Sequence, residues 1–304
     1  MKKLIYILFV STISFLCIFY KDELINFSYD VYKQLSYDNI EITKNKYYRD
    51  YDFLYLKNID NFKPQNSQDI TNIFYTVINS GQETFSFYCP NEYTNCIDDI
   101  KLLANDQARL SHINNFVHPY NSFSHIETTY SSIGEVTITI NKNYTPEEIA
   151  ATEAKVLELT NSLLQGNISD IEKVKIIHDY IINNSKYDSA RSDYNIIEYK
   201  SNLAFGPLIE GYGICGGYSD AMQLFLEELN IKNYKVSSDN HVWNALYLDN
   251  QWYHLDLTWD DPVTSNNTDI LEHNYFLIST DSLLEMESEQ HNFNQDVYME
   301  LKQI

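Results

Sequence analysis

The sequence predicts an α+β protein, because helical and strand-like patterns both occur along its 304 residues. Two capping signatures, at Thr145 and at Ser169, each predict the start of a helix. Two pairs of alternating segments, each joined by a short turn, predict antiparallel hairpins. Hydrophobic residues make up 44% and charged residues 21%, which is globular usage and argues against disorder, collagen or a multi-span membrane protein.

The charge balance limits the partners of this chain. Lys and Arg total 21 against 43 Asp and Glu, which gives a formal net charge of -22. Phosphate binding needs clustered positive charge, so we expect no nucleic-acid partner. An acidic surface favours neutral or basic ligands instead.

The first twenty residues predict a signal anchor. Lys2 and Lys3 precede an uncharged run that ends at Tyr20. No Ala-x-Ala-like site follows, so we expect residues 1–20 to stay uncleaved as a single-pass anchor in the cell membrane. The positive-inside bias then makes the rest extracytoplasmic, or secreted if the signal is cleaved. A lipid-attached Cys17 is disfavoured, because bulky residues precede it.

Between the anchor and Thr145 we expect two regions. Residues 21–65 are rich in Tyr and Asn with weak periodicity, which is typical of a stalk. Residues 66–165 predict an N-terminal α/β region. Its expected elements are a helix over 70–78 ending near Gly81, a strand over 84–89, a helical stretch over 96–113, and a hairpin of 122–130 with 135–141.

The cysteines suggest one pair and one unpaired thiol. Cys89 and Cys96 lie close in sequence with Pro90 and Asn91 between them, so an exported protein could join them in a disulfide. Two free buried thiols are the alternative. Cys215 is left without a partner, and an unpaired thiol outside the cell calls for a role.

The two helix starts are sharply defined. Thr145 is followed by Pro146 and then by Glu148 at the third helical position, which is the pattern of a capping box. Ser169 and Glu172 form the same pattern. We place a domain boundary near Gly166, with a second domain over 166–285 and a C-terminal tail over 286–304. His178 lies beside the apolar face of the second helix, where a structural histidine is expected.

Cys215 lies where a glycine-rich stretch meets a helical pattern. The helix dipole and unpaired N–H groups at such a position stabilise a thiolate and can hold an oxyanion. We expect Gly213, Gly216 and Gly217 to leave room for a substrate carbonyl. The alternative is a buried cysteine in a glycine-rich turn.

The second predicted hairpin pairs 241–248 with 251–258 through a turn at 249–250. A two-residue turn places Trp243 opposite Asp256, so that His241, Trp243, Asp256 and Thr258 share one face. A slip of one residue would separate His241 from Asp256. The register of this hairpin is therefore the premise of the site.

These residues supply the parts of an activated thiol. Cys215 would be the nucleophile, His241 the base that later protonates the leaving group, and Asp256 the group that orients the imidazole. A surface ion pair of His241 with Asp256 is one alternative. Another is a metal set of His241, His254 and Asp256, which leaves Cys215 unexplained. Three histidines earlier in the chain are expected to be structural or on the surface: His112, His118 and His125.

Three blocks together resemble the transglutaminase-like superfamily, in particular its bacterial transglutaminase/protease-like branch related to cytokinesis-type proteins. They are Gly213-Ile214-Cys215-Gly216-Gly217-Tyr218, His241-Val242-Trp243-Asn244, and Trp252-Tyr253-His254-Leu255-Asp256-Leu257-Thr258-Trp259-Asp260-Asp261-Pro262. The resemblance covers roughly residues 169–277. Residues before Thr145 carry no motif of this family.

The resemblance implies a papain-like core, in which a helix bearing the cysteine packs on an antiparallel sheet, and acyl-transfer chemistry on amides. Cys215, His241 and Asp256 match the catalytic triad of the family. No calcium or other cofactor is implied, and Trp259-Asp260-Asp261-Pro262 is expected to be structural. We therefore expect an exported thiol enzyme, either protease, transglutaminase or amidase, acting on protein or peptide amides at the cell envelope. A catalytically silent binding or scaffold module is the alternative.

Overall fold

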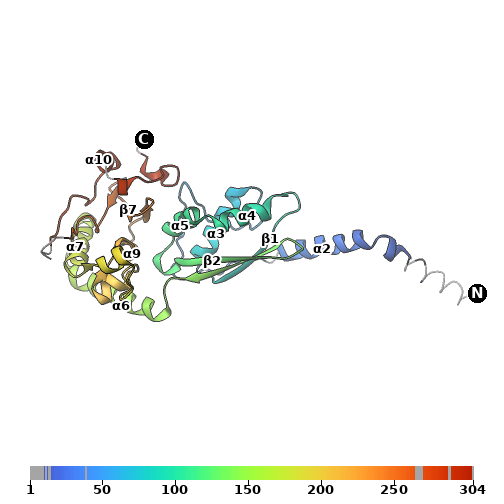
Figure 1. Cartoon of the computed structure of the whole chain (residues 1–304), viewed down its shortest axis with the longest axis horizontal. Helices are drawn as coiled ribbons and strands as arrows, with labels where there is room; N and C mark the ends of the chain where they lie inside the picture. Colours follow the sequence, from blue (N-terminus) through green and yellow to red (C-terminus); the bar gives the residue numbers. More distant parts are fainter. Residues whose placement is uncertain are drawn as a thin grey trace, which may run out of the picture.

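The computed structural model of the chain describes residues 10, 12, 15–37, 40–263, 270–286 and 289–302. Helix α2 (Lys21–Tyr37) projects from one end of a larger body (Figure 1). Most of the predicted anchor, residues 1–20, lies outside the described residues. Within the part of the chain that is described, no helix is both long and apolar enough to span a membrane.

Of the segment 21–65 that was expected as a stalk, α2 projects from the body. After α2, residues 40–63 run along the body, where Phe53, Leu56 and Phe62 are buried in the core. Arg49 is 2% exposed and donates to the carbonyl oxygens of Phe116 (2.9 Å) and Asn233 (3.2 Å). This segment carries apolar side chains without a regular period, which is why the sequence pattern did not indicate its burial.

The N-terminal region is a three-stranded antiparallel sheet of order β1-β3-β2 with helices on one side (Figure 1). The strand and hairpin predictions are confirmed here. A disulfide joins Cys89, which follows β1, to Cys96, the first residue of α4. Its elements are α3 (Ser67–Ser80), β1 (Thr84–Tyr88), α4 (Cys96–Asn105), α5 (Gln107–Asn115), η1 (Pro119–Asn121), β2 (Phe123–Tyr130) and β3 (Glu135–Lys142).

The helical stretch predicted over 96–113 is two helices rather than one. Asp106 follows α4 with extended backbone, and its side chain accepts from the N–H of Arg109 to start α5. An aspartate that caps a new helix in this way divides the helical stretch, even where the pattern of apolar residues continues.

Both predicted capping boxes are confirmed. Thr145 and Glu148 close the first turn of α6 (Pro146–Leu163), and Ser169 and Glu172 do the same for α7 (Asp170–Asn183). The elements that follow are β4 (Lys186–Tyr187), α8 (Ser189–Tyr194), η2 (Gly206–Glu210), β5 (Tyr212–Gly213), α9 (Cys215–Glu228), β6 (Asn233–Ser237), β7 (Val242–Leu248), β8 (Gln251–Leu255), α10 (Thr280–Glu285), η3 (Glu289–His291) and η4 (Met299–Leu301).

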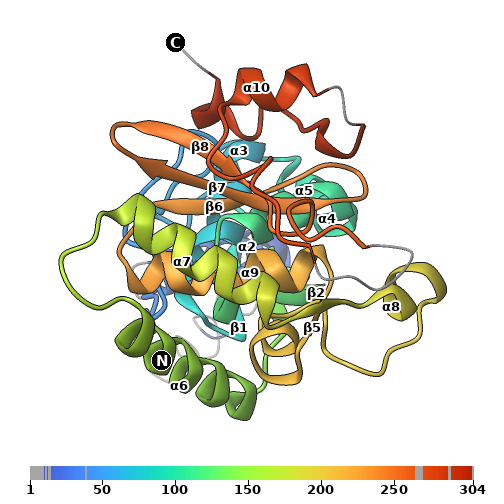
Figure 2. The same cartoon turned by 90° about the vertical axis from the view of Figure 1, so that its left-hand side faces the viewer.

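Helix α9 lies between α7 and the antiparallel sheet β6-β7-β8 (Figure 2). Alternate residues of β7 belong to two different cores. Leu246 and Leu248 pack with α9, whereas Trp243 and Ala245 pack with the N-terminal helices. The sheet therefore has an apolar neighbour on each face, and the expected α+β class is confirmed.

The C-terminal residues do not form a loose tail. Phe293, Val297, Tyr298 and Leu301 are buried in the core shared with the N-terminal region. The hydroxyl of Tyr298 also accepts a hydrogen bond from Nδ2 of Asn115 (2.8 Å). The segment 289–302 consequently packs against the sheet, on the upper side of the view in Figure 2.

Candidate active site

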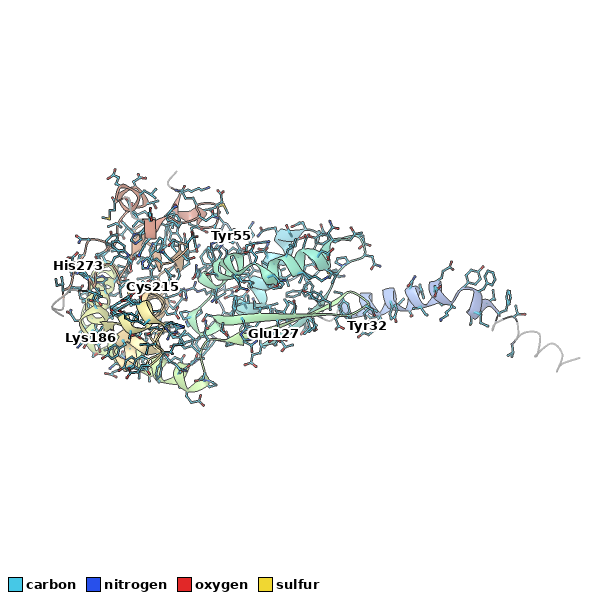
Figure 3. The ribbon with its side chains drawn as sticks, in the orientation of Figure 1. Tyr32, Tyr55, Glu127, Lys186, Cys215 and His273 are labelled. Carbon is cyan, nitrogen blue, oxygen red and sulfur yellow. A yellow bond between two sulfur atoms is a disulfide. The ribbon has the colours of Figure 1, made fainter. Side chains whose placement is uncertain are left out.

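Cys215 is the first residue of α9, as the sequence predicted, and its thiol is free and half-buried. The residue before it, Ile214, offers no side-chain acceptor to the first turn. Helices α6 and α7 differ, because Thr145 and Ser169 cap them. The N–H groups at the start of α9 therefore remain available to a bound carbonyl oxygen. Figure 3 labels Cys215 within the body of the protein, far from α2.

The glycines beside Cys215 make room for the protein's own backbone rather than for a substrate, which corrects the expectation. A Cβ on Gly217 would lie 2.2 Å from the carbonyl oxygen of Ser201, and one on Gly216 would lie 2.9 Å from that of Asn202. A Cβ on Gly213 would meet the ring of Tyr218. These contacts hold the chain around 201–203 against the start of α9.

The predicted register of the second hairpin is confirmed. Leu248 lies opposite Gln251, and Asp249 and Asn250 form the turn with φ of 49° and 67°. His241 immediately precedes β7 and Asp256 immediately follows β8. Nε2 of His241 lies 2.5 Å from Oδ2 of Asp256, so the ends of the two strands bring these side chains together.

Strand β8 ends three residues earlier than predicted, at Leu255. The reason is Asp256 itself, whose Oδ1 accepts from the N–H groups of Thr258 (2.9 Å) and Trp259 (3.3 Å). An aspartate that binds the backbone just after it turns the chain out of the strand. Thr258 consequently lies in a turn and not on the strand face.

The pair of His241 and Asp256 is buried, with 6% and 2% of each residue exposed. Burial lowers the pKa of His241, but the carboxylate of Asp256 outweighs it, and the nearby Cys215 adds to the rise, to about 10. Burial likewise acts to raise the pKa of Asp256, but His241 and His291 hold it well below its usual range. The site therefore favours an imidazolium next to a carboxylate, with Cys215 near the ring.

His291, which the sequence analysis did not single out, is also at this site. Its Nε2 lies 2.9 Å from Oδ2 of Asp256, and the ring is 2% exposed. It stacks on Tyr275 with ring centroids 5.0 Å apart. It comes from the short turn η3, where no repeating pattern marks a lone histidine, so the sequence carried no signal for it.

His254 is not part of the cluster, contrary to the metal alternative. Its Nδ1 accepts from the indole N–H of Trp243 (2.9 Å), its Nε2 contacts Oγ1 of Thr280 (3.1 Å), and burial lowers its pKa to about 3. Instead, His241, Asp256 and His291 are the histidines and carboxylate that come together. The two nitrogen-to-oxygen distances, 2.5 and 2.9 Å, are hydrogen-bond lengths.

His178 is a structural histidine, as predicted. It is fully buried on α7, with Nδ1 2.9 Å from Asp179 and Nε2 3.2 Å from Asp260. Asp260 in turn accepts from the N–H of Tyr275 (2.9 Å). The contacts tie the chain after β8 to α7. Of the other histidines, His118 is buried, His112 half-buried and His125 exposed.

A hollow of about 160 Å³ lies beside the predicted triad. It is bordered by Tyr187, Thr258, Trp259, Asp261, Pro262 and Val263. The hydroxyl of Tyr218 donates to Asp261 (2.5 Å), which fixes that carboxylate. The Trp259–Pro262 stretch therefore has the structural role expected of it and also forms one wall of this hollow.

Comparison with known proteins supports the fold of this region. The model of the transglutaminase-like superfamily matches residues 157–257. The human protein named kyphoscoliosis peptidase is 27% identical over 143 residues, and so is its mouse counterpart. Each match covers 40% of this chain and 21% of the relative, so the chain spans about a fifth of the length of these curated proteins.

Two solved structures are also similar. One is described as a TGase, with 18% identity, a TM-score of 0.34, and 48% of each chain covered. The other is a putative cysteine protease from Cytophaga hutchinsonii, with 15% identity and a TM-score of 0.29, covering 48% of this chain and 65% of that one. The family match extends from α6 to just beyond Asp256. Residues 157–257 are therefore similar to the transglutaminase-like superfamily.

Proposed function

We propose that this protein is an exported, membrane-tethered thiol enzyme that acts on amide or peptide bonds by acyl transfer. The observation that carries the proposal is the arrangement of Cys215 at the start of α9 with His241, which is bound to Asp256 at 2.5 Å. A nucleophile, a base and a group that orients the base are the parts that such chemistry requires.

The first half-reaction forms a thioester. His241 already holds a proton as the imidazolium, paired with the sulfur of Cys215 as a thiolate, and this sulfur attacks the carbonyl carbon of the amide. The N–H groups at the start of α9 receive the developing oxyanion. His241 then protonates the leaving amine, the carbon–nitrogen bond breaks, and the acyl group stays on sulfur. Asp256 stabilises the imidazolium throughout.

The second half-reaction transfers the acyl group from sulfur to water or to an amine. His241 takes a proton from the acceptor, which attacks the thioester, and the thiol of Cys215 is released. Water as acceptor gives hydrolysis or deamidation, and an amine gives a cross-link. The acidic composition favours neutral or basic protein or peptide substrates, for which the cell envelope is the expected setting.

The test begins with the variant Cys215→Ala. Turnover of a substrate should be abolished, because no other group in the proposed mechanism can form the thioester. Incubating the wild-type protein with envelope peptides and quenching in acid should leave an acyl adduct on Cys215, which mass spectrometry identifies. His241→Ala should lose the adduct as well.

A Cys215→Ala protein that keeps full turnover would contradict the proposal. If that variant instead restores the wild-type phenotype in cells and retains a binding partner, the chain acts as a scaffold. Alkylation of Cys215 by iodoacetamide gives a check that needs no substrate. A rate profile across pH that matches free cysteine would also count against an activated thiol.

A further inference from the structure

We propose that His291 is a positioning residue for Asp256, so that the site is completed by the C-terminal segment 289–302. The inference rests on the proposed function, because it assigns a role within that same site. His291 lies outside the part of the chain that the family model matches. It reaches the site from η3, which follows α10.

The hydrogen bonds of Asp256 are the first part of the argument. Its Oδ1 accepts from the backbone N–H groups of Thr258 and Trp259, and its Oδ2 contacts Nε2 of His241 and Nε2 of His291. A carboxylate has about four lone-pair directions. With four partners, Asp256 cannot rotate without losing a bond, and Oδ2 stays directed at His241.

The tautomer of His291 follows from its second nitrogen. Nδ1 is buried and has no hydrogen-bond partner among the described residues. Nε2 faces a carboxylate oxygen, which can only accept, and a second proton on Nδ1 would be an unsatisfied buried donor, which is costly. The proton of His291 is therefore on Nε2, where it donates to Asp256.

Aromatic rings hold His291 in this position. It stacks on Tyr275 with centroids 5.0 Å apart and meets Trp243 edge-on at 5.0 Å and Trp259 at 5.1 Å. The neighbouring Gln290 accepts from the indole N–H of Trp259 (3.1 Å). Packing and hydrogen bonds thus fix the donor beside the carboxylate.

Two variants distinguish the loss of the His291 hydrogen-bond donor from the loss of its ring packing. His291→Phe keeps a flat ring between the aromatic neighbours but has no N–H. His291→Gln gives up the ring but can place its amide nitrogen near the position of Nε2. Both are made in the full chain carrying Cys17→Ser, so that alkylation by iodoacetamide reports on Cys215.

We expect His291→Phe to slow alkylation of Cys215 at neutral pH by about tenfold to a hundredfold, as a small misplacement of a catalytic group does. His291→Gln should recover most of the rate. The acid side of the pH profile should also move to higher pH in His291→Phe. A less well held Asp256 stabilises the His241 imidazolium less, and the imidazolium in turn stabilises the charged sulfur, while Thr258 and Trp259 still bind the other carboxylate oxygen.

The opposite order, with His291→Phe as reactive as the parent and His291→Gln slower, would overturn the inference, and so would equal losses in both. A lower midpoint of thermal unfolding with an unchanged pH profile would show a purely structural role and overturn it too. If the parent thiol itself reacts like free cysteine, the proposed function fails as well. A normal parent with a normal His291→Phe variant overturns this inference alone.

Discussion

Among the residues that the structure describes, two clusters contain two histidines and an aspartate, and they differ in what lies beside them. The cluster of His241, Asp256 and His291 is buried and adjoins a free thiol. The cluster of His178, Asp179 and His273 is partly open to solvent and includes an amine, Lys175, whose Nζ lies 2.7 Å from Asp179. Two clusters with the same residue types therefore differ in burial and in their neighbours.

Burial and the neighbouring groups make the difference. In the first cluster both histidines contact the same oxygen of one carboxylate, and only His241 also contacts Cys215. In the second, His178 lies between two carboxylates that hold it in place, and His273 contacts Asp179 at 2.7 Å. The first arrangement can pass a proton to or from sulfur, and the second joins a loop to a helix.

The largest effect that separates the clusters is expected from Asp256→Asn. Turnover should fall by about 10³- to 10⁴-fold, because an amide cannot stabilise the imidazolium or enforce its tautomer. The basic side of the pH profile should move down from about 10, since Asp256 raises the pKa of His241. Steady-state rates across pH measure both, and a profile that keeps its basic side in place would contradict the role of Asp256.

An intermediate effect is expected from Asp260→Ala, on stability rather than on chemistry. The variant leaves His178 and the N–H of Tyr275 without their buried acceptor, which should lower the free energy of unfolding by about 3 kcal/mol. Turnover per folded molecule should stay close to the wild-type value.

Urea unfolding and active-site titration measure these two quantities. Asp260→Asn is the matched control, because its amide oxygen can still accept from Tyr275. If Asp260→Ala loses as much turnover per folded molecule as Asp256→Asn, the two clusters are not independent.

The smallest effect is expected from Asp179→Asn. Burial tends to raise the pKa of Asp179, but Lys175, His178 and His273 outweigh it and lower the pKa. The carboxylate then stabilises the fold above its usual pKa, and this contribution is lost as pH falls through the lowered value. Because the group is partly exposed, the difference at neutral pH should be under about 1 kcal/mol.

Thermal unfolding of Asp179→Asn and wild type over a range of pH checks this. The two curves should converge at acid pH. A gap that stays constant down to acid pH would mean that charge is not the cause.

The geometry of the chain could be predicted from the sequence where short-range rules apply. A two-residue turn fixes the parity of a hairpin, so the meeting of His241 with Asp256 could be predicted from the spacing. The capping boxes at Thr145 and Ser169 likewise depend on residues within one turn.

Features that depend on distant partners were not predictable. His291 reaches Asp256 through a fold of the chain that no local pattern encodes. The burial of Phe53 and Tyr298 depends on packing between segments at opposite ends of the sequence. The role of the glycines near Cys215 was predicted wrongly for the same reason. Ser201 and Asn202 approach Gly216 and Gly217 from another loop.

The buried guanidinium of Arg49 has a practical consequence for dissecting this molecule. It reaches from residues 40–63 to Asn233, at the start of β6, and pairs with Glu227 at the end of α9. A recombinant fragment beginning near Gly166 would lack this cation and would present the Tyr234 side of its sheet to water. A stable fragment that holds residues 157–257 therefore has to include chain from both ends of the sequence.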